Sequence, residues 1–68
     1  MKIDYPKALM DLRVKINVSQ EELAKVLDVS VVSISRWENG HMEPTKLAKA
    51  KLDKLFEENG VVVKEISE

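Results

Sequence analysis

Two helix start signals stand close together near the middle of this chain, and their spacing restricts the fold more than any other feature. Ser19 is followed by Glu22, which is the pattern of a capping box, and Ser30 is a second N-cap candidate. Asp28 lies between them and tolerates the left-handed conformation in which many helices end. The pattern therefore predicts a helix over 20–27, a turn of about three residues and another helix after Ser30.

Further helix signals flank this pair. Asp4 is the N-cap candidate of a first helix, and Thr45 is the N-cap candidate of a last helix that should run over 46–58. The stop signals of the third and fourth helices are Asn39-Gly40 and Asn59-Gly60. Together these signals predict an all-α fold with a compact four-helix domain over residues 1–60.

Apolar residues at helical spacing predict one shared core for the four helices. Ala24 is the small residue at the crossing of the two middle helices, where a bulkier side chain would push them apart. The other residues expected in the core are Leu9, Leu12, Leu23, Leu27, Val29, Ile34, Trp37, Leu52, Leu55 and Phe56.

The last residues, 61–68, are predicted to form an extended tail. Val61, Val62 and Val63 are β-branched, which favours a strand after the stop signal. In one arrangement the tails of two copies pair antiparallel across a two-fold axis, making the tail a dimerisation strand that buries the valines between subunits. In the alternatives the valines pack on their own domain, or the end becomes ordered only on a partner protein.

The composition argues against several classes of function. The chain has 68 residues and no cysteine, which excludes a disulfide and a thiolate metal site. His41, the single histidine, has no cluster of acids beside it, and the sequence contains neither a glycine-rich phosphate loop nor a nucleophile with its base. We therefore predict no metal, no cofactor and no enzyme activity. No apolar run is long enough to span a membrane, and we expect a cytoplasmic location.

The net charge of −1 argues mildly against nucleic-acid binding, for which a basic domain is expected. The acidic excess, however, lies in residues 55–68, so residues 1–54 carry a small positive excess. Because DNA responds to the field on one face rather than to the total charge, binding to DNA stays compatible with this sequence.

The two middle helices resemble a known family. The stretch from Ser19 to Ser30, followed by Ile-Ser-Arg-Trp-Glu-Asn-Gly at 34–40, is similar to the phage-repressor and Cro-like helix-turn-helix family, also called the XRE family. The resemblance covers about 12–55. It implies a lambda-repressor-like fold and a transcriptional regulator, most often a repressor, that binds a double-stranded DNA operator as a homodimer. The helix that starts at Ser30 would enter the major groove.

The resemblance and the positions of the residues also assign the candidate site. The base-reading positions are Val31, Val32, Ser35 and Arg36, since arginine can bind guanine O6 and N7 and valine can contact a thymine methyl group. The positions expected near phosphates are Gln20, Ser30, Ser33, Asn39, His41 and Lys46. Arg13 and Glu38 match a pair that forms a structural salt bridge in several relatives.

Two alternatives to a repressor stay open. An antitoxin of a toxin–antitoxin pair would bind a toxin protein as well as its operator, and the valine tail is the feature that could serve such a partner. A purely protein-binding helical module is favoured by the negative net charge and by the two valines at reading positions. Gln20, Arg36 and Asn39 argue against that last alternative.

Overall fold

Each helix of the protein begins at the side chain that the sequence marks as its N-cap. The computed structural model describes residues 2–63 and 65–66, and residues 64, 67 and 68 of the predicted tail lie outside this part. The elements are β1 (Lys2–Ile3), α1 (Tyr5–Ile16), α2 (Gln20–Leu27), α3 (Val31–Glu38), α4 (Lys46–Glu58) and β2 (Glu65–Ile66). The predicted four-helix all-α fold is confirmed. In the described residues, β1 and β2 are the only strands, with two residues each.

The capping box before α2 is present in full. Ser19 Oγ accepts a hydrogen bond from the backbone N–H of Glu22 at 3.1 Å, and the backbone N–H of Ser19 donates to Glu22 Oε1 at 3.0 Å. These hydrogen bonds lower the pKa of the Glu22 carboxyl, because they favour its charged form. The start of α2 is therefore fixed by two side chains that are only three positions apart in the sequence.

All four helices are followed by a backbone hydrogen bond that spans five residues and turns the chain away from the helix axis. Asp28 adopts the left-handed conformation predicted for it, with φ 57°, and Asn17 does the same after α1, with φ 55°. In each case the N–H of the next residue donates to the carbonyl five residues before it, as in Val29 N–H to Ala24 O at 2.9 Å. Gly60 has φ 67° and allows the corresponding turn after α4.

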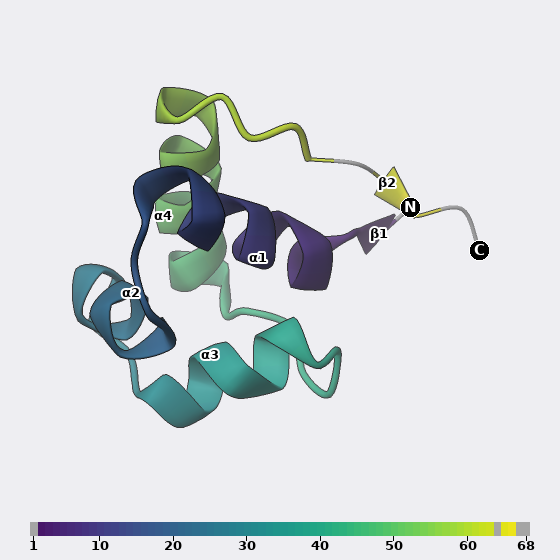
Figure 1. Cartoon of the computed structure of the whole chain (residues 1–68). Coiled ribbons are helices and arrows are strands. Elements are labelled where there is room, and N and C mark those ends of the chain that lie inside the picture. The colour runs from purple at the N-terminus through teal and green to yellow at the C-terminus, as the bar shows by residue number, and fades with distance from the viewer. Residues whose placement is uncertain (1, 64, 67–68) are drawn as a thin grey trace.

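The helices surround one core. In Figure 1, α1 lies between α3 and the chain segment that follows α4, and α2 and α3 form a corner at the end of the molecule away from that segment. Ala24 is 4% exposed, as expected at the helix crossing. Val29 and Leu55 lie at the edge of the core and are only half-buried, whereas the core also contains Tyr5, Ala8, Ala48 and Val61.

The strand in the tail pairs with a strand of its own chain, whereas one predicted arrangement paired the tails of two copies. β2 pairs antiparallel with β1 of the same chain, with Lys2 opposite Ile66 and Ile3 opposite Glu65. Val61 is buried in its own core, and its N–H donates to the carbonyl of Phe56 at 2.9 Å. The turn at Gly60 directs the chain toward β1, and pairing within one chain avoids the entropy cost of association. The valines therefore differ in burial: the side chain of Val61 lies in the core, and Val62 is 74% exposed.

We predict that Ala24→Leu destabilises the fold by roughly 1–3 kcal/mol, because the added side chain overpacks the crossing of α2 and α3. Chemical denaturation measures the loss. Val26→Leu is the matched control, since Val26 is 55% exposed on the same helix and should tolerate the change. Equal stability of Ala24→Leu and the parent would contradict the placement of Ala24 at the crossing.

We also predict that Val61→Ala lowers the free energy of unfolding by about 1–2 kcal/mol, because it removes buried methyl groups from the core. Val62→Ala, the same substitution one residue later, should change it by less than about 0.5 kcal/mol because the side chain is exposed. Thermal and urea unfolding of the two variants provide the comparison. Similar losses for both would show that the segment after α4 does not pack as described.

Candidate nucleic-acid interface

The outer face of α3 brings the predicted base-reading residues together. Ile34, Trp37 and Glu38 are buried toward the other helices, so the remaining faces of α3 point outward. Val31 is 39% exposed, Val32 is 52% exposed and Arg36 is exposed. Because residues three and four positions apart share a helix face, Val32, Ser35 and Arg36 form one row. This row offers apolar, hydroxyl and guanidinium groups on a rigid helix.

Two hydroxyl groups are joined at the start of α3. Ser30 Oγ accepts a hydrogen bond from the backbone N–H of Ser33 at 3.2 Å and lies 3.0 Å from Ser33 Oγ. The two hydroxyls share one hydrogen bond, so one hydroxyl hydrogen is left to donate to an external acceptor. The structure therefore places these two expected phosphate contacts side by side.

Asn39 is engaged within its own helix end. Its Nδ2 atom donates to the carbonyl oxygen of Ser35 at 2.8 Å and lies 3.3 Å from Ser35 Oγ. The amide therefore caps α3 and also contacts one of the residues predicted to read bases. Asn39 is exposed, but part of its donor capacity is used inside the protein.

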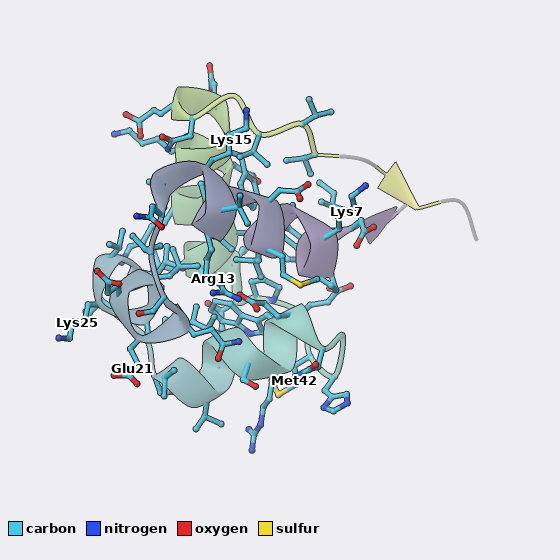
Figure 2. The ribbon with its side chains drawn as sticks, in the orientation of Figure 1. Lys7, Arg13, Lys15, Glu21, Lys25 and Met42 are labelled. Atoms are coloured by element: carbon cyan, nitrogen blue, oxygen red, sulfur yellow. The ribbon has the colours of Figure 1, made fainter. Side chains whose placement is uncertain are left out.

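A buried carboxylate joins three helices. Arg13, in the last turn of α1, donates from Nε to Glu38 Oε2 at 2.7 Å and from Nη2 to Glu38 Oε1 at 2.9 Å. The side chains are 26% and 5% exposed, and the hydrogen bonds raise the pKa of the Arg13 guanidinium. Figure 2 shows Arg13 between α1 and α3. The pair that the resemblance implies is thus present, and it holds the end of α3 against α1.

The same carboxylate also binds Gln20. Gln20 Nε2 donates to Glu38 Oε1 at 3.0 Å, so the first residue of α2 is held by the last residue of α3. The position of Gln20 at a helix start predicts only a phosphate contact and does not predict this bond. No local pattern could have revealed it, since the two residues are 18 positions apart and meet only when α2 and α3 form their corner.

Exposed charges of both signs lie on α3, at the starts of α2 and α4, and on the segment between α3 and α4. Arg36, His41 and Lys46 are exposed, and Lys46 is the first residue of α4. Glu21, which follows Gln20 at the start of α2, is an exposed acid (Figure 2). Glu43 accepts a hydrogen bond from Lys49 Nζ at 3.3 Å, which offsets its charge. Acids are therefore interspersed with the cations of these segments, and a duplex would be attracted by few cations.

Neither a metal-binding cluster nor a membrane-spanning helix is present in the part of the chain that the structure describes. In this part, no three His, Cys, Asp or Glu side chains are grouped so that they could hold a metal ion. No helix within the same residues has the length and apolar character needed to cross a membrane.

Comparison with protein families identifies the chain. The model of the helix-turn-helix family matches residues 9–57, which is more than half of the sequence. The chain therefore belongs to this family of DNA-binding domains, and the resemblance to its phage-repressor and Cro-like members is confirmed. Neither the curated proteins nor the solved structures contain a match.

We predict that Arg13→Met costs on the order of 3 kcal/mol of stability, because it leaves the buried Glu38 carboxylate without its cation. Glu43→Gln is the control, because it removes one partner of the exposed Lys49–Glu43 pair and should cost at most about 1 kcal/mol. Urea denaturation of both variants gives the comparison. Equal costs would show that burial of Glu38 does not matter for stability.

Proposed function

We propose that the protein is a sequence-specific transcriptional regulator, acting as a repressor, that inserts α3 into the major groove of operator DNA. The observation that carries the proposal is the exposed row of α3, presented by a helix whose opposite face is buried. An α-helix fits the major groove, and in helix-turn-helix proteins the second helix of the motif occupies it. The proposal places the protein in the cytoplasm, where it needs no cofactor and catalyses no reaction.

The residues then take distinct roles. Arg36 offers a fork of N–H donors that matches O6 and N7 of guanine, and Val31 and Val32 suit thymine methyl groups. Gln20, at the start of α2, contacts the DNA backbone together with Ser30 and Ser33. Since two valines make no hydrogen bonds with bases, much of the discrimination rests on Arg36 and on DNA shape.

We predict that Arg36→Ala weakens binding to the operator by roughly 1–3 kcal/mol and has a smaller effect on scrambled DNA, because a base contact is lost. Gln20→Ala should weaken binding to both duplexes about equally, because a phosphate contact carries no sequence information. Titrations with DNA adjacent to the protein's own gene and with a scrambled duplex measure both effects. Equal losses on the two duplexes for Arg36→Ala would rule out base reading by this residue.

Operator binding as a homodimer is part of the proposal, since a palindromic site needs two copies of α3 about 34 Å apart. Met42 and Leu47 follow α3 in the chain and are 55% and 69% exposed. We propose that two copies meet through this apolar surface, with both α3 helices facing the same duplex. The tail is less suited to this contact, because β2 already pairs with β1.

We expect a dimeric mass in solution that falls toward the monomer in Leu47→Asp, because a charge opposes burial of that apolar surface. Removal of residues 64–68 is the matched test of the tail, and it retains the buried Val61. The truncated chain should keep the dimeric mass of the full chain. A monomeric truncated chain beside a dimeric Leu47→Asp would assign the contact to the tail instead.

A second candidate function, that of an antitoxin that also binds a toxin protein, is supported by the face of α1 opposite α3. A hollow of about 490 Å³ lies between α1 and the segment after α4, lined by Val14 and Val62 among others. These two valines are 81% and 74% exposed. In Figure 2, Lys7 and Lys15, which also line the hollow, lie on the side of α1 away from α3.

Co-expression with the product of the neighbouring gene separates the candidate functions. A complex that forms with the parent protein and is lost in Val62→Asp, while the DNA affinity stays unchanged, would favour the antitoxin. A protein that forms such a complex and binds no duplex in a mobility-shift experiment would instead be the purely protein-binding module.

A further inference from the structure

Glu38 accepts a hydrogen bond from Gln20 in addition to its salt bridge with Arg13. Its Oε1 atom accepts from Arg13 Nη2 at 2.9 Å and from Gln20 Nε2 at 3.0 Å at the same time. The three residues belong to three different helices, and Glu38 itself is the last residue of α3. The amide of Gln20 is therefore fixed relative to the helix proposed to read bases.

The bond determines which way the Gln20 amide points. A carboxylate can only accept hydrogen bonds, so the amide nitrogen and not its oxygen must face Glu38. One Nε2 hydrogen is used by Glu38, and the second hydrogen is available to a phosphate oxygen. A glutamine side chain loses much rotational freedom when it is held in one place, and here that loss occurs on folding rather than on binding DNA.

We propose that Glu38 is a positioning residue for the DNA-backbone contact made by Gln20. The inference rests on the proposed function and deepens it. Glu38 does not touch the duplex; it presents the Gln20 amide already oriented and keeps the backbone contact at a fixed distance from Arg36 on α3. The carboxylate thereby couples the register of the backbone contact on α2 to the base-reading row on α3.

A double-mutant cycle tests the coupling. In the parent protein, Gln20→Ala should weaken binding to a scrambled duplex about fivefold, the size of one hydrogen bond. In a background that carries Arg13→Met and Glu38→Met together, Gln20→Ala should change the affinity less than about twofold. Both residues are replaced because loss of one charge alone leaves the other buried and unpaired, whereas an apolar pair preserves folding. Circular dichroism verifies that each variant is folded at the temperature of the titration.

Two backgrounds serve as controls. Arg13→Lys keeps a cation beside Glu38 and keeps the acceptor of Gln20, so the fivefold effect of Gln20→Ala should persist. Glu43→Met makes the same carboxylate substitution in the exposed pair with Lys49 and should also leave the effect intact. A fivefold effect of Gln20→Ala in all four backgrounds would overturn the positioning role.

A measurement without DNA separates this inference from the proposed function. The side-chain amide resonances of Gln20 in an NMR spectrum should shift in Glu38→Met and stay in place in Glu43→Met. Unchanged resonances in Glu38→Met would overturn the bond and the inference, even if the protein binds DNA. If the resonances shift in Glu38→Met but the parent protein binds no duplex, the Gln20–Glu38 bond exists and the proposed function is rejected. The positioning role is then rejected with it.

Discussion

The carboxylate of Glu38 is the contact on which the outer face of the protein depends. It is 5% exposed on its side chain and accepts three hydrogen bonds, two from Arg13 and one from Gln20. A buried carboxylate is costly unless it is paired in this way, so Glu38 disfavours arrangements in which α1 and α2 do not meet the end of α3. Together with the apolar core, these hydrogen bonds set the orientation of α3 and of the Arg36 that it carries.

Apolar packing and hydrogen bonds act together at the corner of α2 and α3. Ala24 lets the two helices cross closely, and Leu23, Leu27 and Ile34 fill the space beneath them. Apolar packing sets the distance between the helices, but many apolar side chains of similar volume could provide it. The Glu38 hydrogen bonds, in contrast, require particular donors at particular positions. The corner therefore has a well-defined geometry, which a helix that reads base edges needs.

The exposed charges of the chain suit a protein that binds DNA through few phosphate contacts. Arg36 on α3 and Lys46 at the start of α4 are exposed cations, and Glu21 at the start of α2 is an exposed acid. Because each phosphate contact adds to affinity and to its salt dependence, a surface with few cations binds a duplex weakly as one copy. Two linked copies on a palindromic site compensate for that weakness, which agrees with the proposed homodimer.

The sequence by itself determined the four helices. It predicted most of the core residues, the turn at Asp28, and the N-caps Asp4, Ser19, Ser30 and Thr45. These features are predictable because capping and helical periodicity act between near neighbours. Family resemblance added the Arg13–Glu38 pair. Only the tertiary structure decided that Gln20 joins this pair and that the tail returns to β1 of its own chain. Both depend on how elements far apart in the sequence meet, and local residue patterns carry no information about such distances.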